Sequence, residues 1–391
     1  MARIHAFPLL LLICVTFACT TPGGNLIERP DYSGSRDVPD AGRDVQSFDP
    51  GDQDRPAPDD EGFDATPADP GTTDPGTDPG TPPTPVRLVT DKAALSAIVG
   101  LVDGAMTSLQ MVELEFIDGW APNTVRDALV RAAARGVRVQ VLMESDVEKN
   151  DPRLTELTGA GIEARLDGAS RTLHTKLVVA DRTRALVGST NLSTSSLNYN
   201  HEANLALDGA ALAEPFAAYA DALWSKPAQT AAIPAIPVSG VTPIGDGQYD
   251  AQARTHLAAA TRRVLLVLYH MSDDWSGDVG DIAQAVIDAR ARGLEVRVVL
   301  ESTAYETYVN DQNKACGQRL SAAGVQVRYN DVGTLTHTKM LVTDDVVAVH
   351  SGNWVYSSFN SNHEAGAIVD VPGVTADAIT TFEKIWSESV P

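Results

Sequence analysis

The sequence of 391 residues predicts an α/β fold made of two similar halves, each a mixed β-sheet flanked by helices, related by a pseudo-twofold axis. Three observations support this prediction: a helix, a glycine and a strand follow one another twice, strand and helix patterns alternate, and one polar motif recurs in both halves. Alternating strands and helices are typical of layered α/β proteins. We place the halves at residues 87–235 and 236–391.

Residues 1–18 resemble an export signal. Arg3 and His5 precede an apolar run over residues 7–15, which has the length of a signal-peptide core and is too short to cross a bilayer. Residues 16–20 resemble a bacterial lipoprotein cleavage site, at which Cys19 would become the first mature residue and carry the lipid. We therefore expect an exported lipoprotein of the cell envelope, at the outer membrane or the periplasmic face, with ordinary secretion as the alternative.

Residues 19–86 have the composition of a disordered acidic linker. Between Thr20 and Val86 lie 13 of the 23 prolines, and 15 acidic residues against four arginines. So few apolar side chains cannot offset the entropy cost of folding, and the excess of like charge extends the chain. The sequence therefore predicts a spacer between a membrane and the folded part.

The charge and cysteine content exclude several kinds of site. Lys and Arg total 30 against 52 Asp and Glu, a formal net charge of −22, which makes a groove for nucleic acid unlikely. The three cysteines are Cys14, Cys19 and Cys316, and only Cys316 lies in the predicted folded part. Neither an intrachain disulfide framework nor a cysteine-based zinc site is expected.

The first half is predicted to run strand, helix, strand, short helix, strand. Apolar residues recur at helical spacing in the long helix, which has a proline near its start and a glycine, Gly136, at its end. The elements are expected at residues 109–117, 122–135, 137–145, ahead of Gly161, and 162–166.

The second half repeats this order in register. Its elements are expected at residues 264–269, 279–292, 294–302, ahead of Gly324, and 325–329, with Gly293 ending the long helix. A unit that recurs in this way indicates a duplication, and two such units are expected to pack as a symmetric pair.

The polar residues occur where the two halves agree most closely. Each half contains His-x-Lys-x4-Asp, then a Ser-x-Asn turn, then a Glu eleven positions after the Asn. The first half supplies His174, Lys176, Asp181, Ser189, Asn191 and Glu202, and the second His337, Lys339, Asp344, Ser351, Asn353 and Glu364.

Strand geometry suggests what these residues do. Side chains two positions apart point to the same face of a strand, so each His projects together with its Lys. If the halves meet along the axis, two imidazoles and two ammonium groups converge on a site for one phosphate oxyanion. The Asp of each motif has the opposite parity or lies in a turn, so we expect a structural role for Asp181 and Asp344. The lysines would repel a cation, so neither a metal nor another cofactor is expected.

This duplicated arrangement resembles the phospholipase D superfamily over residues 87–391. The resemblance implies metal-independent cleavage of a phosphodiester through a covalent phosphohistidine. It implies that His174 attacks phosphorus and that His337 protonates the leaving oxygen, then activates water or an alcohol.

The resemblance also implies roles for the remaining motif residues. Lys176 and Lys339 would hold the non-bridging oxygens, and Asn191 and Asn353 would complete that cradle. Ser189 and Ser351 would be small polar supports, and Glu202 and Glu364 would accept the proton on the other nitrogen of each imidazole.

Three histidines need separate interpretation. His350 stands before Ser351 where the first half has a glycine, and the second motif is one residue shorter between Asp344 and Ser351. We expect a shortened turn and an intact site. His201 and His363 precede the motif glutamates and have the opposite strand parity, so a structural role is expected for both.

The substrate is less well defined by the sequence. Trp120 and Trp275 follow the first predicted strand of each half, and these two residues or Trp354 could contact acyl chains, although Trp354 could equally pack beneath the site. Residues 305–311 are a candidate substrate-covering loop. We expect an enzyme that cleaves phospholipids or transfers their phosphatidyl group; an exported endonuclease and a non-catalytic surface-binding module are the alternatives. The oligomeric state stays open.

Overall fold

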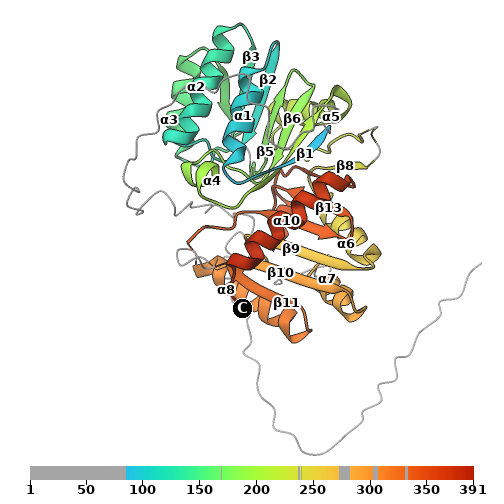
Figure 1. Cartoon of the computed structure of the whole chain (residues 1–391). Coiled ribbons are helices and arrows are strands. Elements are labelled where there is room, and N and C mark those ends of the chain that lie inside the picture. The colour runs from blue at the N-terminus through green and yellow to red at the C-terminus, as the bar shows by residue number, and fades with distance from the viewer. Residues whose placement is uncertain are drawn as a thin grey trace, which may run out of the picture. The chain divides into compact units, whose positions relative to one another are not determined.

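Two mixed β-sheets of seven strands each, one per half, form the framework of the part of the chain that the structure describes (Figure 1). The structure is a computed structural model and describes residues 85–391 without 169, 237, 239, 273–281, 303–306 and 331–332. All of these residues belong to one structural unit. The export signal, Cys19, all but the end of the predicted linker, and Trp275 lie outside them. Among the helices described, none is long and apolar enough to cross a bilayer.

The first sheet has the strand order β1-β7-β6-β5-β2-β3-β4. Strands β2, β3 and β4 pair in parallel and the others antiparallel. The strands are β1 (Val86–Thr90), β2 (Ser108–Glu113), β3 (Arg138–Met143), β4 (Glu163–Leu166), β5 (Lys176–Ala180), β6 (Arg184–Gly188) and β7 (Ala203–Asp208). The helices are α1 (Ala93–Asp103), α2 (Trp120–Ala134), α3 (Asn150–Gly159), α4 (Thr194–Asn198) and α5 (Ala210–Ser225).

The second sheet has the same topology, with the order β11-β10-β9-β12-β13-β14-β8. Its strands are β8 (Val241–Ile244), β9 (Arg263–Leu268), β10 (Glu295–Glu301), β11 (Gln326–Asn330), β12 (Lys339–Thr343), β13 (Val346–His350) and β14 (Gly366–Val369). Its helices are α6 (Tyr249–Ala259), α7 (Ile282–Ala291), α8 (Thr307–Ala322), α9 (Tyr356–Asn360) and α10 (Pro372–Glu388). The predicted fold class, two similar mixed-sheet halves, is confirmed.

The glycines that were expected to end the long helices do so through their backbone conformation. Gly136 and Gly293, which follow α2 and α7, have φ angles of 87° and 89°. A residue with a Cβ rarely adopts this left-handed conformation, whereas glycine does so readily. Each glycine therefore turns the chain directly from the helix into the next parallel strand.

Two of the predicted elements differ from those observed. The strand predicted for residues 109–117 ends at Glu113, because the chain then leaves the sheet and Phe116 pairs with Leu192 beyond β6. The covering loop predicted for residues 305–311 was wrong in its described part, since residues 307–311 form the start of α8.

One apolar core joins the halves. It combines residues from the inner faces of both sheets with side chains of α5 and α10, including Phe216 and Phe382, both fully buried. A separate core lies on the outer face of each sheet, beneath α1 and α2 in the first half and α6 and α7 in the second. Strands β5 and β12 are buried on both faces, which explains their continuous apolar sequences.

The second motif is one residue shorter than the first because its hairpin turn is shorter. The turn between β5 and β6 contains residues 181–183, whereas the turn between β12 and β13 contains only Asp344 and Asp345. The Ser-x-Asn turn itself keeps its length. The shortening predicted at this motif is therefore in the hairpin turn, at the opposite end of the strand from Ser351.

The replacement of Gly188 by His350 is balanced across the neighbouring strand. Gly188 pairs with Asn204 in the first sheet, and His350 pairs with Gly366 in the second. The Asn204 Oδ1 atom accepts the backbone N–H of Thr190 at 3.3 Å, and His350 Nδ1 accepts that of Gly352 at 3.0 Å. In each half, one strand of the pair carries a glycine and the other a polar side chain that binds the Ser-x-Asn turn. The glycine is on β6 in the first half and on β14 in the second.

We predict that Gly366→Ala destabilises the protein. A Cβ at this position would clash with the Val349 carbonyl oxygen and lie 2.7 Å from His350 Cα. Overpacking against backbone atoms costs about 1–3 kcal/mol, so the free energy of unfolding should fall by that amount in urea denaturation followed by circular dichroism. Gly373→Ala is the control, because a Cβ at that position would have no neighbouring atom within 4 Å. Equal stability of the two variants would contradict this packing.

Candidate active site

The two His–Lys pairs lie at the starts of equivalent strands. Lys176 begins β5 and Lys339 begins β12, and His174 and His337 lie two residues ahead of these strands; all four side chains are buried. The structure brings the two His–Lys pairs to one place between the halves, as the hydrogen bonds to the opposite glutamates show.

Each imidazole is bonded to a carboxylate of the opposite half. His174 Nδ1 donates to Glu364 Oε2 over 3.0 Å, and His337 Nδ1 donates to Glu202 Oε1 over 3.0 Å. These pairs are separated by 190 and 135 residues in the sequence. Each pair of motif histidine and motif glutamate is therefore completed only across the two halves.

Backbone hydrogen bonds between the halves place these pairs. Leu173 forms a bridge with His363, and His201 forms one with Thr336. The N–H of His174 donates to the His363 carbonyl at 3.0 Å, and the N–H of His337 donates to the His201 carbonyl at 2.9 Å. Glu364 and Glu202 directly follow His363 and His201. These backbone bridges, which form the seam between the halves, therefore place each carboxylate beside the motif imidazole of the opposite half.

His201 and His363 are held by acidic side chains and a carbonyl. His201 Nδ1 lies 3.2 Å from Asp91 Oδ2 and Nε2 lies 3.0 Å from Glu388 Oε2. His363 Nδ1 lies 2.6 Å from Asp246 Oδ2 and Nε2 lies 2.6 Å from the Pro227 carbonyl. Both imidazoles thus face away from the motif histidines.

Asp91 and Asp246 are two positioning residues that the sequence analysis missed. Each accepts, over 3.1 Å, the backbone N–H of the motif glutamate that follows its histidine. They occupy equivalent positions, just ahead of α1 and α6. Their flanking sequences differ, so only the alignment of these helix starts could have identified them.

Serine hydroxyls fix the two carboxylates. Ser189 donates to Glu202 and Ser351 donates to Glu364, and each serine Oγ accepts the N–H of the residue after that glutamate at 3.0 Å. Ser196, which the sequence analysis did not select, also donates to Glu202 at 2.5 Å. The carboxylates are therefore held by several donors before any ligand binds.

The two asparagines lie in the turns that follow β6 and β13. Asn191 and Asn353 are buried, and the Oδ1 atom of each has no hydrogen-bond partner among the described residues. Buried amides are normally satisfied, so both retain capacity to bind a ligand group.

The lysines are held with their ammonium groups near the histidines. Lys176 Nζ donates to the His174 carbonyl and Lys339 Nζ to the His337 carbonyl, each over 2.8 Å. Burial lowers the pKa of Lys176 to about 8 although Glu364 and Glu113 oppose the shift, and burial also lowers the pKa of Lys339 well below its usual value. A bound oxyanion would favour the charged forms of both.

Burial also favours neutral imidazoles. It lowers the pKa of His174 to about 4, against the attraction of Glu364, and it lowers the pKa of His337 against that of Glu202. Burial acts to raise the pKa of Glu364, but interactions with His174, His350 and Lys176 outweigh it and lower the value to about 2. At neutral pH the Nδ1–H of His174 is therefore donated to the ionised Glu364, and in both histidines the bond through Nδ1 leaves Nε2 as the reactive nitrogen.

Asp181 and Asp344 lie in the hairpin turns at the far ends of β5 and β12. Asp181 accepts the backbone N–H groups of Met106, Thr107 and Ser108, and Asp344 accepts those of residues 261–263. Burial acts to raise the pKa of each carboxyl, but these donors outweigh it and lower both values to about 2. The two carboxylates tie each hairpin to the start of its neighbouring strand and are remote from the imidazoles.

The tryptophans differ in their surroundings. Trp120 is 55% exposed at the start of α2, whereas Trp354 is fully buried and donates to the Tyr249 hydroxyl at 3.3 Å. Of the two interpretations of Trp354, packing beneath the site therefore applies, and Trp120 is available to a ligand or a surface.

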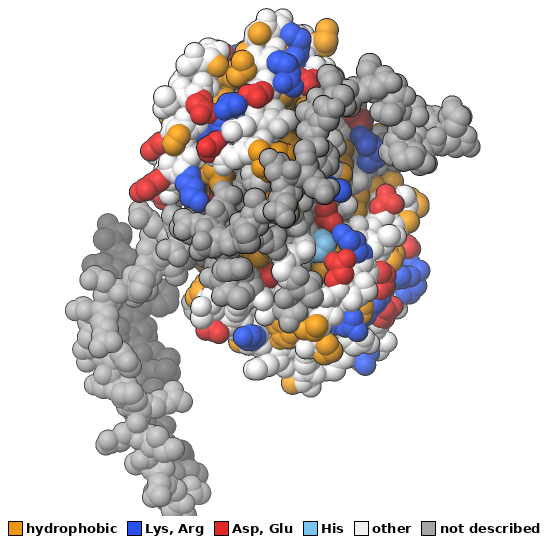
Figure 2. All heavy atoms as spheres, turned by 60° about the vertical axis from the view of Figure 1, so that its left-hand side comes forward, with side chains coloured by type: hydrophobic (Ala, Val, Ile, Leu, Met, Phe, Trp, Pro, Cys, Tyr) orange, Lys and Arg blue, Asp and Glu red, His pale blue; other side chains and the backbone are white. Residues whose placement is uncertain are grey.

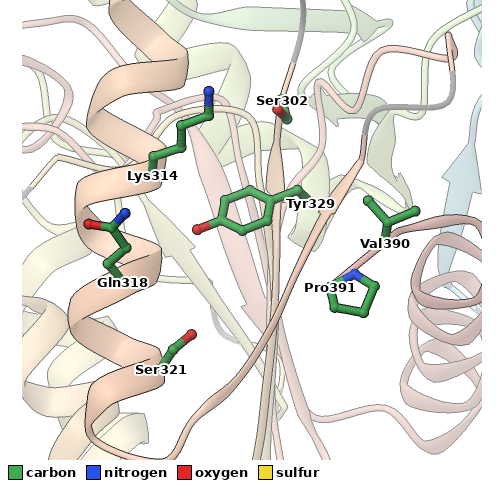
Figure 3. A pocket seen from close by; sticks show the side chains of 7 residues that line it. All are labelled: Ser302, Lys314, Gln318, Ser321, Tyr329, Val390 and Pro391. Carbon is green, nitrogen blue, oxygen red and sulfur yellow. The ribbon is translucent and has the colours of Figure 1, made fainter.

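The surface charges and the cavity described next lie apart from the His, Lys, Asn and Glu residues of the site. On the face drawn in Figure 2, basic and acidic side chains of the described residues are interspersed. A cavity of 540 Å³ lies between α8 and the C-terminal residues and is lined by Ser302, Lys314, Gln318, Ser321, Tyr329, Val390 and Pro391 (Figure 3). Within the described part of the chain, no three His, Cys, Asp or Glu residues are placed to hold a metal ion.

Comparisons with known proteins agree with the duplication. The family model described as cardiolipin synthase, phospholipase D-like domain, matches residues 98–224 and 254–386. A phospholipase D of Rickettsia bellii is 29% identical over 99 residues, 25% of this chain and 49% of the relative. A mitochondrial cardiolipin hydrolase of Xenopus laevis is 32% identical over 114 residues, 28% of this chain and 50% of the relative. These matches span about half the length of the relatives.

A solved structure is similar over a larger share of the chain. Phosphatidylserine synthase of Haemophilus influenzae superposes with a TM-score of 0.59 at 11% identity, covering 78% of this chain and 86% of that one. At this identity the likeness concerns the fold alone.

We predict that His174 titrates far below an ordinary histidine, at a pKa of about 4. Glu364→Gln should lower that value further, because the variant loses the negative charge that favours the imidazolium. Imidazole NMR of the full chain from pH 8 downward measures both effects, with Glu383→Gln as the control for a carboxylate remote from the site. A His174 pKa of 6.5 or above would contradict the buried geometry.

Proposed function

The chain belongs to the phospholipase D superfamily, and on this basis we propose that it cleaves the phosphodiester of phospholipids through a covalent phosphohistidine, without a metal ion. The observation that carries the proposal is the pair of crossed His–Glu hydrogen bonds, at 3.0 Å each, beside two buried lysines. Such a pair orients two imidazoles with the same nitrogen free for chemistry.

The first step uses the two histidines in opposite roles. His174 Nε2 attacks phosphorus, the bond from phosphorus to the head-group oxygen breaks, and His337 donates a proton from Nε2 to that oxygen. The anionic substrate favours the imidazolium form of His337, which otherwise is neutral at pH 7. Glu364 stabilises the positive charge that develops on His174 as the nitrogen–phosphorus bond forms.

The second step reverses the roles. His337 takes a proton from water, the water oxygen attacks phosphorus, and the bond from phosphorus to His174 breaks. Water gives phosphatidic acid, and an alcohol in its place gives a new phosphatidyl ester. Lys176, Lys339, Asn191 and Asn353 would hold the two non-bridging oxygens through both steps.

Phospholipid is the substrate class that the observations favour. The chain is similar to proteins named phospholipase D and cardiolipin hydrolase, and its net charge of −22 disfavours a polyanionic substrate. We further propose export and attachment to a membrane through Cys19, which would keep the enzyme close to its substrate.

We predict that the full chain releases phosphatidic acid from mixed phospholipid vesicles, and phosphatidylethanol when ethanol is added. Mass spectrometry measures both, and excess EDTA should leave the rates unchanged. His174→Ala and His337→Ala should each reduce turnover at least ~10³-fold, because each step needs both imidazoles. His256→Ala, on α6, is the matched control.

Three outcomes would contradict this proposal. Wild-type activity in either alanine variant would exclude the two-histidine mechanism, and inhibition by EDTA that one metal reverses would exclude metal independence. A folded protein that yields no lipid product would exclude phospholipid as the substrate, and single-stranded and duplex DNA would be tested next.

We predict that kcat/KM falls on the alkaline side near pH 8 rather than near 10.5, the usual lysine value. The pKa of Lys176 is lowered to about 8, so its positive charge is lost as the pH rises through that value, and Lys339 shifts in the same direction. Initial rates of phospholipid cleavage in micelles of an uncharged detergent, taken from pH 5 to 10, measure this alkaline limb of the kcat/KM profile. Lys176→Arg should lower the maximum and leave an alkaline limb set by Lys339 alone. A wild-type profile that is flat to pH 10 would contradict the prediction.

A further inference from the structure

The two halves of the site differ at one pair of positions. Strands β2 and β9 lie beside β5 and β12 in the same register, which places Glu113 opposite Lys176 and Leu268 opposite Lys339. Two residues further along, the first half has Glu115 and the second has His270. The first half therefore adds two carboxyl groups that the second half lacks.

Both glutamates lie beside the residues that would hold the phosphate. Glu113 shares a sheet face with Lys176 because the two residues are directly opposite in an antiparallel pair. The carbonyl of Glu115 accepts the N–H of Leu192, next to Asn191, at 3.0 Å. Glu115 and Asn191 are each 4% exposed, so both belong to the buried centre between the halves.

Lys176 does not supply the missing hydrogen bond to the Glu113 carboxyl. The ammonium group of Lys176 donates to the His174 carbonyl, and the Oε2 atom of Glu113, a residue that is 1% exposed, has no hydrogen-bond partner among the described residues. Burial raises the pKa of Glu113 well above its usual value, with Glu115 adding to the shift. A buried carboxyl oxygen without a donor is costly, and a ligand that supplies one removes that cost.

We propose that Glu113 and Glu115 form an acidic subsite that selects phosphodiesters whose head group carries a primary ammonium. This inference rests on the proposed function and adds the substrate class. The ammonium donates to the unpartnered Glu113 oxygen and to Glu115 while the lysines bind the phosphate. A head group with a further negative charge, or with hydroxyls alone, gains less or is repelled.

The experiment compares two head groups in the full chain. Turnover is measured on vesicles of phosphatidylethanolamine and of phosphatidylglycerol, and equilibrium binding on the soluble glycerophosphoethanolamine and glycerophosphoglycerol. Wild type should prefer the ethanolamine compound in both assays. Glu115→Gln and Glu113→Gln should each reduce that preference about tenfold.

A control variant separates this effect from a change in total charge. Glu163→Gln removes one negative charge from the exposed start of β4 and should leave the preference unchanged. A preference that Glu115→Gln and Glu113→Gln leave at the wild-type value would overturn the subsite. If wild type turns over neither lipid, the proposed function fails; an ethanolamine preference in binding that the two variants lose would still support the subsite, and its absence would overturn it.

Discussion

The hydrogen bond from each imidazole to the carboxylate of the other half is the constraint on which the rest of the site depends. Those two bonds require that Glu202 and Glu364 cross the seam, and the cross-strand bridges at His201 and His363 accomplish this. Asp91 and Asp246 then hold the crossing backbone. The surrounding apolar core excludes water, which keeps the imidazoles neutral and makes every unpartnered polar atom near them expensive.

Duplication explains both what the halves share and where they differ. The histidine, lysine, serine, asparagine and glutamate of each half serve a common centre and recur in both halves. Within each half, a different change is balanced across two paired strands: Gly188 pairs with Asn204 in the first sheet and His350 with Gly366 in the second, because only one member of each pair can carry a side chain. Positions such as Glu113 and Leu268 lie one strand away and have diverged.

Local rules made much of this predictable from the sequence. Side-chain alternation placed each histidine with its lysine, and Gly136 and Gly293 marked the helix ends, because both effects act over a few residues. The pairing of each histidine with the glutamate of the opposite half was not predictable. The spacing from Asn to Glu is the same in both halves and fits pairing within a half equally well. Asp91 and Asp246 lack a shared flanking motif, and Glu113 has no counterpart to draw attention to it. The position of the shortened turn depended on tertiary pairing.

The distance along the chain between His174 and Glu364 has a consequence for biosynthesis. Because 190 residues separate them, the carboxylate that orients His174 leaves the ribosome long after the strand that carries the imidazole. Contacts of such high sequence separation form late and slow the folding of a domain. The reactive groups of the first half therefore stay unassembled until the strand that carries Glu364 has been synthesised and has paired across the two halves.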